Sequence, residues 1–360
     1  MSNTIGARLS GRENNFDFIR FVAALAVIFS HSFYLTNTTE REPLTVFTSG
    51  RFDTASLSVA TFFIISGFLI TMSFQRAKSV YAYFEARFLR IYPALIVVIL
   101  CTVFIIGPLL TTYKLKSYFV SSETIKYFIL NTLMVKVQYT LPGVFEHDGA
   151  ANTVNASLWT LPIELACYCF VAIVGLLLAK RVVASIVLGG ITLLIFYYVF
   201  LNGFIALLFY FFFGAMLYVL RDKIVLNGWL AALAFILLMA DLYFNNKPDS
   251  NFIIKSVNII VKGVALSYVI MYLAFVKTTY IKNFAKKGDY SYGLYIWAFP
   301  LQRIINISIQ GLGPYSLFCI SAIVTLIFAV LSWHVIEKRA LQLKNKLLYR
   351  TAIPYSEVRT

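Results

Sequence analysis

Ten stretches of about 20 mainly apolar residues follow one another along this chain, and no other feature limits its possible folds as strongly. A helix of about 20 residues is long enough to cross the hydrocarbon core of a bilayer. Of the 360 residues, 60% are hydrophobic and 13% are charged, whereas a soluble domain has about a quarter of its residues charged. The sequence therefore predicts an all-α, polytopic membrane protein with about ten transmembrane helices.

The boundaries of the predicted spans follow from where each apolar stretch begins and ends. An eleventh apolar segment, 124–137, is too short to cross a bilayer and is expected at the interface or re-entering beside other helices. The ten predicted spans are 16–35, 54–74, 93–112, 157–179, 182–200, 203–220, 227–244, 253–276, 290–309 and 313–336.

The distribution of lysine and arginine between the loops predicts the orientation. With the N-terminus inside, the inner segments hold 20 Lys and Arg residues and the outer segments hold 7. Basic residues collect on the cytoplasmic side of membrane proteins, so both termini are expected in the cytoplasm. The predicted organisation is an inner tail at 1–15, one transmembrane domain at 16–336 with a long outer loop at 113–156, and an inner tail at 337–360.

The net charge of +15 has two possible readings. A basic patch on a soluble domain would indicate nucleic-acid binding, but these charges lie in short loops between apolar stretches. There they fix the orientation and meet anionic lipid headgroups, so we expect membrane lipid as a partner and no nucleic acid. All four cysteines fall within apolar stretches without the spacing of a zinc site, so no metal is expected.

Three ionisable residues within predicted spans are candidate functional residues, because charge is costly inside a bilayer. Arg20 and His31 lie in the first span and Glu164 in the fourth. Eleven residues of helix turn through about 1100°, so Arg20 and His31 share one face about 16 Å apart. Glu164 is expected at a depth similar to that of His31, where a carboxylate can orient a histidine. The alternatives are snorkelling for Arg20 and an interhelical hydrogen bond for His31.

Further candidates lie at the inner surface and in the ninth span. Arg87 and Arg90 are three residues apart in FEARFLRIYP and share a helical face that suits phosphate binding, although the positive-inside rule alone also explains them. Pro93 is expected to begin the third span. Tyr292 belongs to an aromatic cluster that also suits a membrane interface, and Arg303 either faces a polar cavity or snorkels outward.

Several motifs in this order resemble the acyltransferase 3 family of membrane proteins over residues 14–340. The motifs are Arg20 with His31, FFIISGFLIT with Ser66 and Gly67, RFLRIYPAL with Arg87 and Arg90, LWTLPIE with Trp159 and Glu164, SYGLYIWAFP, and SWHVIE ending at Glu337. One departure is Ala298, where relatives often carry histidine.

This resemblance implies a membrane O-acyltransferase of the bacterial inner (cytoplasmic) membrane. The implied donor is acetyl-CoA from the cytoplasm, and the implied acceptor is a sugar hydroxyl of an envelope glycan or lipid-linked glycan. The expected roles are catalytic for His31 and Glu164, donor binding for Arg20, Arg87 and Arg90, and substrate binding for Trp159, Tyr292 and Arg303. His31 would act either as general base or as a transient acyl carrier. A glycan transporter or flippase without acyl chemistry, and a non-catalytic assembly or sensing protein, are the alternatives.

Overall fold

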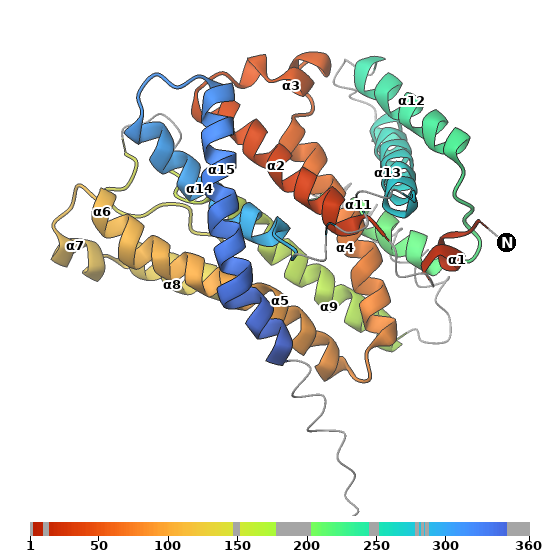
Figure 1. Ribbon diagram of the computed structural model, residues 1–360, viewed down its shortest axis with the longest axis horizontal. Coiled ribbons are helices and arrows are strands. Elements are labelled where there is room, and N and C mark those ends of the chain that lie inside the picture. The colour runs from red at the N-terminus through yellow and green to blue at the C-terminus, as the bar shows by residue number, and fades with distance from the viewer. Residues whose placement is uncertain are drawn as a thin grey trace, which may run out of the picture.

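The structure is a bundle of helices, which Figure 1 shows from one side. It is a computed structural model, and the part of the chain that it describes contains helices and no strands. The predicted span at 182–200 lies outside this part. The described residues are 3–9, 14–146, 152–177, 203–244, 252–277, 281, 284 and 288–343.

Eight long helices coincide with predicted spans to within a few residues. The approximate limits of these eight helices could therefore be predicted from the apolar stretches alone, without knowledge of their packing. These helices are α2 (Phe16–Leu35), α4 (Thr54–Arg76), α9 (Leu161–Leu177), α11 (Gly203–Val219), α12 (Gly228–Phe244), α13 (Phe252–Phe275), α14 (Ser291–Ser308) and α15 (Pro314–Ser332).

Five helical stretches of the described part are long and apolar enough to cross a membrane. Three further apolar helices within the described residues are shorter, at Ala206–Val219, Gly228–Tyr243 and Ile260–Phe275. The part of the chain that the structure describes is thus all-helical, with the long apolar helices of a multi-pass membrane protein. The five stretches are Phe16–Leu35, Thr54–Arg76, Val80–Leu110, Ala156–Leu176 and Pro314–Leu343.

The third predicted span begins earlier than expected. Helix α5 runs over Val80–Cys101 and continues through the π-helical η2 (Thr102–Ile106) into α6 (Gly107–Leu110). The helix begins after Ser79, whose Oγ accepts a hydrogen bond from the Ala82 amide at 3.1 Å, as an N-cap does. Pro93 lies inside α5, so the prediction that it begins the helix is wrong. Arg87 and Arg90 consequently lie within the long helix α5 rather than before it.

Helix α14 packs against both α2 and α15, and in Figure 1 it passes behind α15. Its first thirteen residues, Ser291–Arg303, are all buried. A side chain at Gly293 would lie 2.9 Å from the Cα of Ala329 on α15. Ala298 is completely buried in an apolar cluster with Ala24 and Ala329. Small residues let these three helices approach closely, as they do in many membrane proteins.

A second close crossing joins α4 to α11. A Cβ added to Gly67 would lie 1.9 Å from the Phe211 carbonyl oxygen, and one added to Gly214 would lie 2.0 Å from the Ile64 carbonyl oxygen. Only glycine permits this approach of two backbones. The crossing fixes α4, which carries many of the residues that line the site described below.

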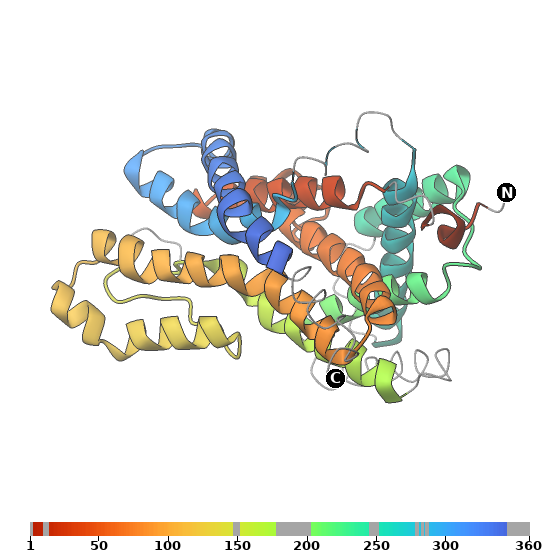
Figure 2. The ribbon, with the colours of Figure 1, turned by 60° about the horizontal axis from the view of Figure 1, so that its bottom comes forward.

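The remaining short elements cover the ends of the bundle. Helix α8 lies beside α5 (Figure 2), and with 12 residues it is too short to span, as predicted for 124–137. At the opposite end, Ile5 donates to the Ile224 carbonyl and Asn15 to that of Ala274. The other short elements are α1 (Ile5–Leu9), η1 (Thr39–Arg41), α3 (Pro43–Phe47), α7 (Leu115–Val120), α8 (Ser122–Leu133), η3 (Ala156–Thr160) and η5 (Trp333–Glu337).

Candidate active site

Two cavities meet inside the bundle, on the same face of α2. The first, here called the arginine cavity, has a volume of about 110 Å³ and is lined by Arg20, Arg87, Arg90 and Glu164. The second, the histidine cavity, has a volume of about 290 Å³ and is lined by His31. Arg20 and His31 thus line two successive cavities along one helix, which agrees with the predicted shared face.

A thin barrier separates the two cavities. Val59 of α4 and Tyr295 of α14 line both of them. The Tyr295 hydroxyl is 2.8 Å from that of Thr160 in η3, and its ring packs edge-on against Phe62 at 5.7 Å between centroids. The barrier therefore consists of one aromatic side chain held by one hydrogen bond, with apolar side chains beside it.

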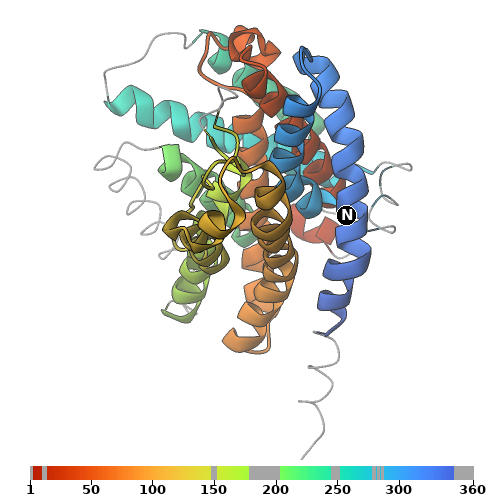
Figure 3. The ribbon, with the colours of Figure 1, turned by 90° about the vertical axis from the view of Figure 1, so that its left-hand side faces the viewer.

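An ion-pair network closes one end of the arginine cavity. The Asp289 carboxylate accepts hydrogen bonds from Arg20 at 2.9 Å and from Arg90 at 2.5 Å. Arg90 also approaches Glu337 at 3.4 Å and lies over the ring of Tyr292. Asp289 thus joins α2, α5 and the start of α14 through charge-assisted hydrogen bonds. Figure 3 shows α5, which carries Arg90, between α15 on one flank and α9 on the other.

The environment of Asp289 keeps it ionised. Burial raises the pKa of its carboxyl group, but the two guanidinium groups and the hydrogen bonds from Ser291 lower it further. The net result is a pKa below the usual range for aspartate. Two of the three arginines predicted to bind the donor therefore already share a carboxylate as their ion-pair partner.

Arg87 differs from the other two arginines. Its Nη2 is 3.4 Å from the Ser73 hydroxyl, its Nε is buried without a hydrogen-bond partner, and no described carboxylate lies within ion-pairing distance of it. A guanidinium presents five donors, so most of the capacity of Arg87 to bind an anion is unused. It is the arginine of this cavity best suited to an anionic ligand.

Glu164 lies in the arginine cavity, on the other side of the barrier from His31. It accepts hydrogen bonds from Tyr168, one turn along α9, and from Ser66 of α4 at 3.4 Å. Pro162 occupies the early-helix position expected of it, at the second residue of α9. The two residues predicted to be catalytic are thus brought to adjacent cavities and not to one.

His31 faces a different set of neighbours. Its ring packs edge-on against Phe299 at 5.1 Å between centroids, and its Nδ1 is buried without a hydrogen-bond partner in the described structure. The carboxylate that lines the same cavity is Asp53. Asp53 also caps α4, because it accepts a hydrogen bond from the Ser56 amide at 2.6 Å.

The three residues predicted to bind substrate lie in three different places. Trp159 lines the histidine cavity. Tyr292 lines the arginine cavity, and its hydroxyl donates to the Ile91 carbonyl at 2.9 Å. Arg303 is fully buried, with its guanidinium 4.4 Å from the centre of the Phe145 ring, and it lines neither cavity.

Comparison with known proteins decides the family. The family model described as an acyltransferase domain matches residues 13–334. The chain belongs to the acyltransferase 3 family. This confirms the resemblance and the prediction that the protein is an acyltransferase. No solved structure matches the chain.

Two curated relatives extend over almost the whole chain. The "O-acetyl transferase" of Shigella phage Sf6 is 30% identical over 351 residues, which cover 92% of this chain and 96% of the relative. The "Nodulation protein 10" of Rhizobium leguminosarum bv. viciae is 27% identical over 378 residues, which cover 95% of this chain and 96% of the relative. The family match at residues 13–334 includes every residue that lines the two cavities.

Sequence reasoning missed three residues of this site, namely Asp289, Asp53 and Tyr295. Two of them left a signal. Asp53 stands three residues before Ser56 at the start of an apolar stretch, as N-cap residues do. Asp289 is the only acidic residue in the basic segment 277–289. Tyr295 could be recognised only as a member of the aromatic cluster around Tyr292, because its place between the cavities depends on where η3 and α14 meet.

Proposed function

We propose that the protein moves an acetyl group from cytoplasmic acetyl-CoA to a sugar hydroxyl of an envelope glycan or lipid-linked glycan in the bacterial inner membrane. The family gives the acyl chemistry, and the name of one relative gives the acetyl group and the oxygen acceptor. The proposed orientation of the protein in the membrane rests on the excess of Lys and Arg in the predicted inner segments, which include 1–15, 75–92 and 277–289. In this proposal the arginine cavity is on the cytoplasmic side.

The observation that carries the proposal is the meeting of two chemically different cavities at Tyr295. A cationic cavity on one side suits an anionic donor. A histidine on the other side suits proton removal from a hydroxyl group. A donor from one compartment and an acceptor from the other could then react across a single side chain.

The proposed reaction needs one proton acceptor and one leaving group. His31 takes the proton of the acceptor hydroxyl, the oxygen attacks the thioester carbonyl, the bond between carbon and sulfur breaks, and coenzyme A leaves as a thiolate that takes up a proton. In the alternative route a ring nitrogen of His31 attacks the thioester first, and the released thiolate takes up the proton that the ring loses. The acetyl group then passes to the sugar oxygen, and the proton of the hydroxyl group returns to the imidazole. Both routes require the acetyl group to pass the barrier at Tyr295.

The two carboxylates have separate parts in this proposal. Asp53 shares the cavity of His31 and would offset the positive charge that the ring acquires, as the third member of a catalytic triad does. Glu164, with the Tyr168 hydroxyl on it, would act on the donor side, where the thiolate takes up its proton. Trp159 lines the acceptor cavity and is the candidate for stacking on a sugar ring.

The test is transfer of label from acetyl-CoA into envelope glycan by membranes that hold equal amounts of wild type or His31→Ala. Wild-type incorporation that falls at least about a thousandfold in His31→Ala supports the proposal, since loss of a catalytic base or nucleophile has effects of this order. The matched control is His334→Ala, because His334 is exposed and lines neither cavity.

Two outcomes would contradict the proposal. Equal labelling by wild type and His31→Ala would remove His31 from the chemistry. The transporter alternative would be favoured if the glycan crossed the membrane without any acyl donor and if labelling did not exceed that of empty membranes.

A further inference from the structure

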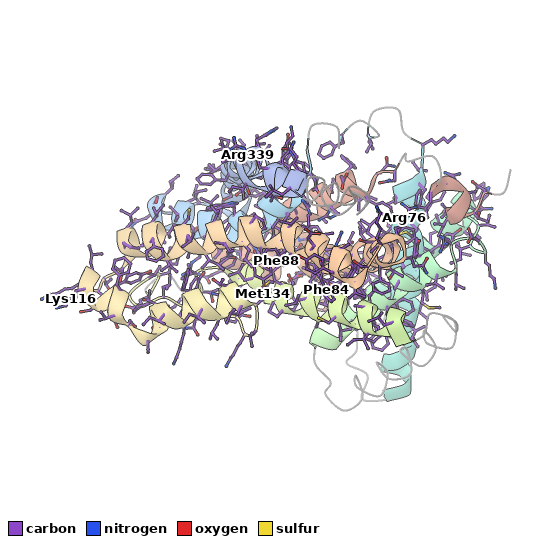
Figure 4. All side chains as sticks on the ribbon, turned by 90° about the horizontal axis from the view of Figure 1, so that it is seen from below. Arg76, Phe84, Phe88, Lys116, Met134 and Arg339 are labelled. Carbon is purple, nitrogen blue, oxygen red and sulfur yellow. The ribbon has the colours of Figure 1, made fainter. Side chains whose placement is uncertain are left out.

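A third cavity opens where α4 ends and α5 begins. Its volume is about 500 Å³, and it is lined by Arg76, Lys78 and Arg87 together with small and apolar residues. Cavities of roughly 300–1,000 Å³ accommodate small organic ligands. Figure 4 looks onto this end of the bundle, with Arg76 labelled at the end of α4 and Arg339 on a separate helix.

This α4–α5 cavity adjoins the arginine cavity. Leu69 and Arg87 line both of them. A ligand can therefore occupy the α4–α5 cavity and extend past Arg87 into the arginine cavity. With Arg87 at the junction, the unused donors of its guanidinium are within reach of either part of such a ligand.

The charge of the α4–α5 cavity is uncompensated. Three cationic side chains line it and no carboxylate does. Arg76 and Lys78 are exposed, and neither forms an ion pair with a described residue. The first turn of the 22-residue helix α5 begins beside them, after Ser79, and the N-terminal end of a helix adds favourable potential for an anion.

The contrast with the arginine cavity shows where anionic groups are best held. There, Arg20 and Arg90 both contact Asp289, so an anion would have to compete with a buried carboxylate. In the α4–α5 cavity the cations have no such competitor. Phosphate groups prefer cations with free donors.

We propose that the α4–α5 cavity binds the phosphate groups of the nucleotide part of coenzyme A, on Arg76, Lys78 and Arg87. The pantetheine arm then runs past Arg87 into the arginine cavity and brings the thioester towards Tyr295. This inference rests on the proposed function for the identity of the donor. The same chemistry would also accept the phosphate of an anionic lipid headgroup, so the test separates the two sources.

The experiment measures binding and not transfer. Full-length protein in phosphatidylcholine nanodiscs is titrated with coenzyme A, dephospho-coenzyme A, adenosine 3′,5′-bisphosphate and pantetheine. The variant Arg76→Gln/Lys78→Gln is compared with Lys338→Gln/Arg339→Gln, which removes two exposed charges elsewhere. We expect the first variant to bind coenzyme A and the bisphosphate at least about tenfold more weakly, with pantetheine unchanged, and the control to match wild type.

Several results would overturn the proposal. The first would be an unchanged affinity of the Arg76→Gln/Lys78→Gln variant for coenzyme A and the bisphosphate. The second would be a loss of affinity for pantetheine as large as the loss for coenzyme A. A third is a lipid signature, in which wild type binds added phosphatidylglycerol, the first variant does not, and both bind coenzyme A alike.

Failure of this inference and failure of the proposed function are distinguishable. Loss of bisphosphate binding in the variant supports the cavity even if no acetyl transfer is found. Conversely, acetyl transfer that depends on His31, with coenzyme A binding unchanged in the variant, would sustain the function and remove the cavity from it.

Discussion

The arginine cavity and the histidine cavity hold their polar groups in opposite ways. In the arginine cavity, Arg20 and Arg90 are fixed by Asp289, and Glu164 accepts hydrogen bonds from Tyr168 and Ser66. In the histidine cavity, the His31 ring is held by packing against Phe299 and its buried Nδ1 has no hydrogen-bond partner in the described structure. The first arrangement preserves a charge pattern, and the second leaves a proton-exchanging group available.

This difference suits the two halves of the proposed reaction. The fixed network keeps the arginine cavity in one shape for the arm of the donor, because preorganised groups lose less entropy on binding. An acceptor hydroxyl needs a group whose protonation changes during the reaction. Variants that act on only one cavity should therefore change either donor binding or the rate of transfer, but not both.

The largest effect is expected at Asp289. The substitution Asp289→Asn keeps an acceptor for Ser291 but removes the carboxylate that Arg20 and Arg90 share, and leaves them the more distant Asp17 and Glu337. Breaking a buried ion pair from one side costs about 3–5 kcal/mol, and these side chains are only 14–21% exposed. We expect a marked loss of thermal stability of the purified protein in detergent. The control is Asp222→Asn, whose side chain is 74% exposed, and a Tm for Asp289→Asn equal to that of the control would contradict the role of the network.

The same network predicts a dependence of stability on pH. The folded-state pKa of Asp289 is lowered, so its contribution is fully present above the unfolded value of about 3.9 and declines as pH falls through the lower folded value. The difference in Tm between wild type and Asp289→Asn should therefore persist at pH 5, and the part that is due to the charge of Asp289 should shrink only below about pH 4. A difference that vanished already at pH 5 would be inconsistent with a lowered pKa.

The next effect is expected on the donor side, at Arg87. The substitution Arg87→Gln removes a guanidinium whose Nε is unpartnered, so it should weaken donor binding without disturbing an ion pair. A charge-assisted hydrogen bond contributes about 1.5–3 kcal/mol, so we expect the KM for acetyl-CoA to rise about tenfold or more with little change in kcat. Steady-state kinetics of acetyl transfer measure this, with Arg339→Gln as the control. A fall in kcat at unchanged KM would place Arg87 in the chemistry instead.

On the acceptor side, Asp53→Asn should give the converse result. Asparagine caps a helix as well as aspartate does, so the variant keeps the hydrogen bond to Ser56 and loses only the charge near His31. We expect kcat to fall about tenfold, an effect typical of a residue that supports a general base, while the KM for acetyl-CoA and the Tm stay unchanged. Asp53 would then be a positioning residue. An unaltered kcat would limit it to capping α4.

The sequence predicted most of the helices but not how they combine. The limits of α2 and α4 agree with the apolar stretches, because each helix begins where a polar residue precedes such a stretch. The start of α5 was predicted too late, at Pro93, because proline is favoured in the first turn of a helix and disfavoured in its interior. In the structure Pro93 lies inside α5. Length and apolarity are local properties of a chain, and the sequence reports them well.

The site was predictable only where its residues share a helix. Arg20 and His31 lie on one face because the helical repeat requires it. Glu164 and His31 come from different helices, and their separation depends on Tyr295 and Thr160, which meet through the packing of α14 against η3. The partners of the arginines were missed for the same reason, because Asp289 and Arg90 are 199 residues apart.

The smallest effect, and the one that bears most directly on the comparison, is expected at the barrier. The substitution Tyr295→Phe keeps the ring against Phe62 but removes the hydrogen bond to Thr160, which contributes about 0.5–1.5 kcal/mol. The ring should then leave the closed position more often, and water from the histidine cavity should reach the thioester. We expect acetyl-CoA hydrolysis without acceptor, measured as thiol release, to rise a few-fold in Tyr295→Phe and further in Tyr295→Ala.

The control removes the same hydrogen bond from the other side. Thr160→Val should therefore match Tyr295→Phe, and the double variant should show no further increase in hydrolysis. Hydrolysis at the wild-type level in all of these variants would mean that Tyr295 does not control passage between the cavities.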